Sequence, residues 1–381
     1  EVGFGPGFAL QQVASMLTVF CSPSRYVQGK NATDALADEM AKFGWSGKVM
    51  IIAGRSAAKL LGDTWQTKLP KAGFTVLIEK FSGECSTSEI DRLAQVAAEQ
   101  KVSVVVGAGG GKVLDTSRAV AARLDLPAVN CPTVASSDAP CSALSVVYRE
   151  NGEFDQYFFY KRNPDLVLVD TAVIAQAPPR LLVAGMGDAL ATWFEADTVI
   201  NARKRNQLGG GTTISARALA RLCHETLMND GLAALNSVRK KAVTPALERL
   251  VEANTLLSGL GFESGGLAIA HSVHNGLTTL PETHHYLHGE KVAFGLLVQL
   301  VAEGKPSSLI AEIMQFCSQV GLPISLAQLG VKDHSRESLQ GVAVRASAPG
   351  ETAHNEPFAV DADLLLDAIM AADALGSQFA A

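Results

Sequence analysis

The chain has 381 residues, of which 48% are hydrophobic and 18% charged, and its mean hydropathy is +0.18. This length suffices for about two domains with a large core, and the composition excludes a disordered chain, a collagen-like fibre and a small disulfide scaffold. The net charge is −6 and there is no extended run of lysine and arginine, so no nucleic acid partner is expected.

The six cysteines lie far apart and form no Cys-x-x-Cys pair. We therefore expect free thiols in a reducing compartment rather than a zinc knuckle or a disulfide framework. No apolar run approaches the ~20 residues needed to cross a bilayer, and the N-terminal region shows no secretory signal. A cytoplasmic protein without membrane contact is expected.

The first half of the chain alternates short runs rich in valine and isoleucine with helical stretches. One such helix is predicted at 86–100, where a serine precedes apolar residues at helical spacing. This alternation predicts a parallel sheet covered by helices on both faces. The predicted strands occupy residues 48–53, 74–78, 102–106, 128–130 and 166–169.

The pattern changes after residue 178. Before it, a polar and aromatic stretch at 148–160, with Asn151-Gly152 in its middle, predicts a hairpin. After it, strand signals nearly vanish and Ala- and Leu-rich stretches have helical periodicity. We predict an α/β dinucleotide-binding domain over 1–178 and an all-α domain over 179–381. The clearest predicted helices of the second domain are 215–228, 245–260 and 308–320.

A glycine-rich turn, GAGGGK at 107–112, follows a predicted strand and opens a helix. Glycines let the backbone approach a ligand closely, and the free N–H groups of a helix N-terminus favour an anion such as phosphate. The turn is not Gly-x-Gly-x-x-Gly, because Lys112 occupies the third glycine position. It is not a Walker A loop either, because Val113 follows the lysine. We predict a phosphate-binding loop, with a plain tight turn as the alternative.

Five of the eight histidines lie close together in the sequence. His271 and His274 are neighbours on one helix face, and His288 begins the next helical run. A helix, a turn and a second helix start could bring His271 and His288 to one ion, and imidazole suits zinc, iron, copper or nickel. His284 and His285 are predicted to be exposed loop residues.

The best carboxylate to complete such a site is Asp188, which lies among small residues near the start of an apolar helix. An unpaired carboxylate would be costly there. Taken singly, Asp188 could be a helix cap and each histidine a satisfied core residue. Taken together, these residues favour a metal site over those structural explanations.

These motifs resemble the metal-dependent alcohol dehydrogenase family often called iron-containing, and within it the glycerol dehydrogenases. The resemblance covers nearly the whole chain from about Ser22 and implies a dehydroquinate synthase-like architecture, with an α/β dinucleotide-binding domain and an all-α domain. It rests on several motifs in the family's order: GGGKVLD at 109–115, PTVASSDAPCS at 132–142, GDALAT at 187–192, HSVHNG at 271–276 and HGEK at 288–291.

The resemblance implies a zinc ion held by Asp188, His271 and His288. Iron-type members have a fourth ligand, a histidine, where this chain has Thr192, which favours the three-ligand zinc arrangement. The implied reaction is oxidation of glycerol to dihydroxyacetone, by hydride transfer from a metal-bound alkoxide to nicotinamide. A homo-oligomer, typically an octamer, is also implied.

The same resemblance assigns roles to further residues. Asp138 and Phe262 line the polyol pocket, where Asp138 would accept hydrogen bonds from neighbouring hydroxyls and favour a vicinal diol. His274 is a candidate proton relay, with a structural role as the alternative. The implied contacts to the cofactor are Gly54, Gly109, Gly110, Gly111, Lys112, Asp115, Thr133, Ser136, Asp138, Ser142, Leu144 and Tyr148.

The cofactor expected from the resemblance is NAD, but one position departs from the family. NAD-using glycerol dehydrogenases carry an aspartate, which binds the adenosine ribose, where this chain has Gly54 followed by Arg55. An acid there repels a 2′-phosphate, whereas a glycine and an arginine accommodate one. NADP therefore stays an open alternative.

Three other functions are alternatives for this sequence. A 3-dehydroquinate synthase-like lyase and a glycerol-1-phosphate dehydrogenase-like enzyme share the architecture, but both need several basic residues around the metal to hold a phosphorylated substrate. The stretch 262–291 contains only Lys291. The third alternative is a helical interaction protein with a degenerate nucleotide-binding fold, which would bind no metal and reduce no cofactor.

Overall fold

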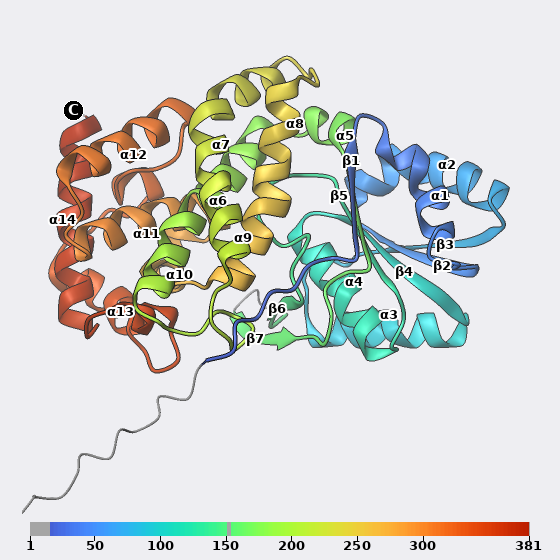
Figure 1. The fold of residues 1–381 in the computed structure, drawn as a ribbon, viewed down its shortest axis with the longest axis horizontal. Coiled ribbons are helices and arrows are strands. Elements are labelled where there is room, and N and C mark those ends of the chain that lie inside the picture. The colour runs from blue at the N-terminus through green and yellow to red at the C-terminus, as the bar shows by residue number, and fades with distance from the viewer. Residues whose placement is uncertain (1–15, 151–153, 381) are drawn as a thin grey trace, which may run out of the picture.

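The computed structural model describes residues 16–150 and 154–380 and consists of a parallel sheet with its covering helices, followed by a helical region (Figure 1). Within these residues all six cysteines are free, as predicted, and five of them are buried. None of the helices formed by the described residues is long and apolar enough to span a membrane.

The sheet has six parallel strands in the order β1-β8-β5-β4-β2-β3. The five predicted strands are confirmed, and each is extended by one or more residues. The sixth, β1, was not predicted, because its sequence RYVQG lacks a run of β-branched residues and it lies half-exposed at the sheet edge. The strands are β1 (Arg25–Gly29), β2 (Gly47–Ala53), β3 (Phe74–Lys80), β4 (Val102–Gly109), β5 (Ala128–Pro132) and β8 (Leu166–Asp170).

Both faces of the sheet are buried, because alternate residues of each strand pack against different helices. Val49 and Ile51 of β2 pack in one hydrophobic cluster with residues of α1 and α2, whereas Met50 and Ile52 pack with residues of α3 and α4. Ser86 caps α3 by accepting a hydrogen bond from the backbone of Glu89. The helices are α1 (Leu36–Ala41), α2 (Arg55–Lys71), α3 (Thr87–Glu99) and α4 (Gly111–Arg123).

The predicted hairpin is present as two antiparallel strands, β6 (Leu144–Tyr148) and β7 (Phe154–Phe159). Its first strand begins four residues before the predicted stretch, and the predicted Asn151-Gly152 turn lies outside the described residues. The hairpin is tied to α4 through Asp115, whose carbonyl oxygen accepts from Ser145 Oγ at 2.8 Å and whose carboxylate accepts from the backbone of Val146 at 3.1 Å.

From residue 171 onward the described chain forms helices joined by loops, around one large hydrophobic cluster. The helix α6 begins at Pro179, next to the predicted domain boundary; the division at residue 178 itself stays a prediction. The helices are α5 (Thr171–Gln176), α6 (Pro179–Asn201), α7 (Ile214–Arg239), α8 (Pro245–Glu252), α9 (Ser258–Gly265), α10 (Ile269–Leu277), α11 (His288–Ala302), α12 (Ser307–Val320), α13 (Arg336–Ala346) and α14 (Ala362–Ala380).

The helix predicted at 245–260 is interrupted by a π-helical turn, Ala253–Leu257, between α8 and α9. This turn connects the helical region to the sheet. Thr255 Oγ1 lies 2.8 Å from the hydroxyl of Tyr26 in β1, and Asn254 Nδ2 donates to the carbonyl oxygen of Ala135, which follows β5, at 3.0 Å. Single π turns within helices often occur at functional sites.

Candidate functional site

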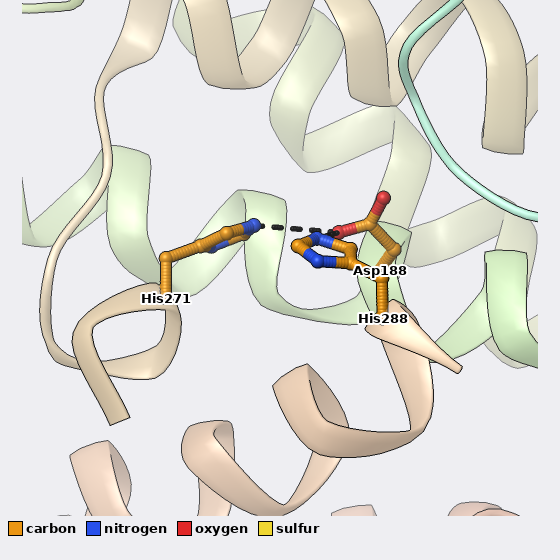
Figure 2. Close-up of side chains that lie close together, drawn as sticks. All are labelled: Asp188, His271 and His288. Carbon is orange, nitrogen blue, oxygen red and sulfur yellow. Dashed lines mark hydrogen bonds and ion pairs between the residues drawn. The ribbon is translucent and has the colours of Figure 1, made fainter. Parts of the chain in front are cut away.

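The three predicted metal ligands converge from three helices, and their side chains point toward one another (Figure 2). Asp188 lies in α6, His271 in the first turn of α10, and His288 at the start of α11. Oδ1 of Asp188 is 3.4 Å from Nε2 of His271 and 3.2 Å from Nε2 of His288. One ligand atom from each side chain lies within 4.8 Å of the other two.

Glycines let the helices that carry Asp188 and His288 approach closely. A Cβ atom on Gly289 would lie 1.8 Å from the carbonyl oxygen of Ala184, and one on Gly187 would lie 2.2 Å from the carbonyl oxygen of Gly289. Any larger residue would push α11 away from α6. The small residues beside both ligands therefore determine the distance across the site.

The carboxylate of Asp188 is 1% exposed. Burial opposes its negative charge, but His288 and His271 more than offset this and lower its pKa below the usual value. Its second oxygen accepts a hydrogen bond from the backbone N–H of Asp138 at 3.1 Å. A buried carboxylate with two imidazole nitrogens beside it is an arrangement that a cation would stabilise.

A buried glutamate that the sequence analysis missed orients His271. Nδ1 of His271 lies 2.6 Å from Oε2 of Glu195, and since a carboxylate accepts, this nitrogen carries the proton. The other oxygen of Glu195 accepts from the backbone N–H groups of Ala268 and His271. With Nδ1 held by Glu195, Nε2 of His271 is the nitrogen that faces Asp188 and would bind a metal. The spacing could have revealed this residue, because Glu195 lies two turns after Asp188 in α6.

His274 contacts the ligand His288 rather than Asp188. Its Nε2 is 2.9 Å from Nδ1 of His288, and its Nδ1 is 3.1 Å from Oδ1 of Asn275. Burial and the charges of His288 and Lys291 lower the pKa of His274 well below its usual value, so the ring is neutral. Both ring nitrogens have protein partners, which favours the structural role over the proton relay of the two roles predicted for it. His284 and His285 are exposed, as predicted.

The donor set fits a divalent transition metal. Two imidazole nitrogens and one carboxylate oxygen are ligands typical of zinc and of non-haem iron. Three protein ligands leave a coordination position open, which distinguishes a catalytic site from a closed structural one. Thr192, where the resemblance predicts a fourth ligand only in iron-type members, is buried, and its hydroxyl lies 2.8 Å from Ser258 Oγ.

Asp138, one of the two residues predicted for the polyol pocket, lies next to the ligand Asp188. Asp138 is half-buried, and Oδ2 accepts from Ser258 Oγ at 3.2 Å. Burial, together with the charge of Asp188, raises the pKa of Asp138 well above its usual value. Phe262 is buried in α9, one helical turn after Ser258. A polar chain from Thr192 through Ser258 thus ends on Asp138.

The strand order places the predicted phosphate loop at a change of direction in the sheet. From β2 the chain adds β3 on one side and then β4 on the other, so β2 and β4 are neighbours whose connections run in opposite directions. Ligands of open parallel sheets bind at the carboxyl ends of two such strands. Gly54 follows β2 there, and its N–H donates to the carbonyl oxygen of Ala108 in β4 at 3.1 Å.

The glycine turn contains two kinds of glycine. A Cβ atom on Gly109 would lie 2.7 Å from the side chain of Val113, so this glycine is needed for close packing of β4 against α4. Gly110 and Gly111 have room for a Cβ, with the nearest atoms at 3.5 Å. Gly110 is the N-cap of α4 and supplies no side-chain hydrogen bond, so the first N–H groups of the helix are left for a ligand.

The other predicted cofactor contacts fall into two groups. Lys112 and Tyr148 lie together, with the lysine Nζ 5.1 Å from the ring centre, and Thr133 and Ser136 follow the end of β5. The second group bonds inward, to the buried Arg118. Its members are Asp115 and Ser142, while Leu144 begins β6. Whether any of these residues contacts a cofactor stays a prediction.

Comparison with known proteins agrees with this geometry. Residues 23–171 match the family model for iron-containing alcohol dehydrogenase. The chain is 52% identical to a glycerol dehydrogenase of Thermotoga maritima, covering 95% of this chain and 98% of the relative. It is 50% identical to one of Pseudomonas putida, covering 94% and 98%.

Solved structures give the same result for the fold. The structure of glycerol dehydrogenase from Schizosaccharomyces pombe superposes with a TM-score of 0.92 at 38% identity, covering 96% of this chain and 92% of that one. The match extends over both the sheet and the helical region. The chain therefore belongs to the iron-containing alcohol dehydrogenase family.

Proposed function

We propose that the protein is a zinc-dependent, NAD-linked polyol dehydrogenase that oxidises glycerol to dihydroxyacetone. The observation that supports this most strongly is the convergence of Asp188, His271 and His288, with ligand atoms within 4.8 Å of one another, beside Asp138. The similarity to glycerol dehydrogenases over almost the whole chain supports the substrate class.

The chain's own residues suggest how a diol would be handled. Asp188, His271 and His288 would hold the metal, and Ser258 keeps the carboxylate of Asp138 in place next to them. Asp138 would accept a hydrogen bond from the second hydroxyl of a vicinal diol, and the buried ring of Phe262 would help to exclude water. When bound, the metal supplies a Lewis acid that makes a hydroxyl more acidic, and the nicotinamide accepts the hydride.

The residue at the position of the fourth ligand favours zinc over iron. Thr192 stands where iron-type members have a histidine, and its hydroxyl contacts Ser258 instead. A Cβ on Gly261 would lie 2.5 Å from the Thr192 side chain, so this part of α6 is packed closely.

The choice between NAD and NADP depends on two residues at the end of β2. Gly54 has φ −64° and room for a Cβ, so its backbone does not require glycine. Arg55 is exposed and has no hydrogen bond or ion pair with the described residues. NAD is the cofactor that the similarity favours, and a free arginine here keeps NADP as the alternative.

The decisive experiment is reduction of NAD and of NADP by glycerol, propanediols and butanediols, before and after treatment with a chelator. We expect NAD reduction with glycerol, loss on chelation, recovery with Zn²⁺, and dihydroxyacetone as the product. Activity that survives complete metal removal would contradict the proposal. Recovery with Fe²⁺ alone would keep the reaction but replace zinc.

Two expectations complete the proposal. A homo-oligomer, possibly an octamer, and a cytoplasmic location follow from the similarity and composition; size-exclusion chromatography with light scattering tests the first. The lyase and glycerol phosphate alternatives stay disfavoured, because Lys291, the one basic residue of the stretch 262–291 apart from histidine, is buried with its amine 3.5 Å from the carbonyl oxygen of Thr283.

A further inference from the structure

A chain of hydrogen bonds leads away from the ligand His288 to the acidic residue Glu351. His288 Nδ1 lies 2.9 Å from His274 Nε2, and His274 Nδ1 lies 3.1 Å from Asn275 Oδ1. Asn275 Nδ2 then donates to Glu351 Oε2 at 3.0 Å. The other oxygen of Glu351 is bound by Arg345 Nη1.

The carboxylate of Glu351, at the end of this chain farthest from His288, determines the direction of each of its hydrogen bonds. A carboxylate paired with arginine only accepts, so the amide nitrogen of Asn275 faces Glu351 and its oxygen faces His274. His274 must then carry its proton on Nδ1 and accept at Nε2. His288 in turn carries a proton on Nδ1, so Nε2, which lies 3.2 Å from Asp188 Oδ1, is the nitrogen left to bind a metal ion.

These hydrogen-bond directions are also compatible with the contact between Asn275 and Tyr157. The side chain of Tyr157 in β7 also hydrogen-bonds with Asn275. An amide oxygen has two lone pairs and an amide nitrogen two protons, so this contact fits in either direction without reversing Asn275.

We propose that Glu351 and Asn275 are positioning residues that fix the ligand-competent tautomer of His288 from three hydrogen bonds away, as Glu195 does for His271 by direct contact. The inference rests on the metal site of the proposed function. Outer partners of metal ligands commonly change metal affinity by about 10–100-fold. Because Glu351 acts through two intermediates, the lower end of that range is expected.

The test is the affinity of the metal-free protein for Zn²⁺, measured by competition with a chelator and without any substrate. Glu351→Gln offers both a donor and an acceptor to Asn275, so the chain can reverse, and we expect about tenfold weaker binding. Arg345→Met breaks the ion pair but keeps the accepting carboxylate, and should leave the affinity unchanged. Glu337→Gln, the same chemical change at an exposed position of α13, is the matched control.

The Asn275→Leu variant tests the same proposal if the Glu351→Gln variant does not fold. It should weaken Zn²⁺ binding at least as much, and adding Glu351→Gln to it should cause no further loss, because Glu351 acts only through Asn275. Equal losses in Glu351→Gln and Arg345→Met, an additive double variant, or unchanged affinity in Glu351→Gln and Asn275→Leu would each overturn the proposal. A wild-type protein that binds no metal would instead refute the proposed function.

Discussion

Each histidine of the metal site contacts a side chain from another helix, whereas the glycine turn after β4 presents backbone that carries no side chain of its own. Around Asp188, the geometry depends on hydrogen bonds that Glu195, His274 and Asn275 accept. At the end of β4 it depends on the absence of side chains at Gly110 and Gly111. The first kind of site is sensitive to loss of polar partners, and the second to addition of a methyl group.

Removing a ligand charge should give the largest effect. Asp188→Asn keeps the size of the side chain but removes the negative charge that a cation requires, so metal content and turnover should fall by more than about a hundredfold, the upper range for residues outside the ligand set. His271→Ala should have the same result. Metal analysis of the purified variants and initial rates with glycerol measure this, and retained turnover in either variant would contradict the ligand assignment.

Changing the hydrogen-bond partner of a metal ligand tests whether metal binding depends on how the free ligand is oriented. Glu195→Gln retains an oxygen for the backbone N–H groups but also offers an N–H to His271, so the ring can reverse. Zn²⁺ affinity should fall about 10–100-fold. Chelator competition measures it, with the melting temperature of the metal-free protein as a check on folding; equal affinities would mean that Glu195 does not orient the ligand.

Two alanine substitutions separate packing from ligand approach in the glycine turn. Gly109→Ala places a methyl group 2.7 Å from Val113 and should destabilise the protein by about 1–3 kcal/mol. Gly111→Ala has room and should change stability by less than about 0.5 kcal/mol while raising the KM for the nicotinamide cofactor. Urea denaturation and cofactor titration separate the two, and an unchanged KM in Gly111→Ala would argue against a phosphate at this turn.

Buried carboxylates should also make stability depend on pH. Burial and the charges of Glu303 and Glu195 raise the pKa of Glu356 to about 8. Since the folded protein holds this proton more tightly than the unfolded chain, the free energy of unfolding should fall as pH rises from about 4.5 toward 8.

Glu356→Gln removes that dependence. It should be more stable than the wild type at pH 9, where the folded protein must ionise a buried carboxyl group, and similar to it at pH 5. Urea denaturation at the two pH values gives the difference, with Glu337→Gln as the exposed control. An equal difference at both pH values would mean that Glu356 is ionised throughout.

The smallest expected effect is on the preference for NAD over NADP. Gly54→Asp fits sterically and adds an acceptor for a ribose hydroxyl, so the ratio of kcat/KM for NAD over NADP should rise about two- to tenfold, the value of one hydrogen bond. Arg55→Ala should lower kcat/KM for NADP alone. If neither variant moves the ratio, the adenosine ribose does not lie at the end of β2.

The sequence predicted the elements whose pattern is strong and local. Five strands, the capped helix α3 and the hairpin follow from composition and periodicity. The edge strand β1 was missed because its residues pair on one side and carry no apolar run. The π turn at Ala253–Leu257 was missed because one additional residue hardly alters a helical pattern.

The ligands were predictable and most of their partners were not. Asp188, His271 and His288 stand in recognisable motifs, whereas Glu195, Asn275 and Glu351 have ordinary identities and matter only through burial and contact. Glu351 is 63 residues from His288 in the sequence, so only the packing of α10 near the loop after α13 connects them.

The π turn between α8 and α9 sets the rotation of α9 about the helix axis relative to α8. Each residue advances an α-helix by about 100°. Deleting one residue from Ala253–Leu257 would restore continuous α-helical bonding, yet it would rotate Ser258 away from Asp138 by roughly that angle. The helix would then be more regular, but the residues that align the substrate would be displaced. A homologue that lacks the turn should therefore keep its fold and prefer a different alcohol.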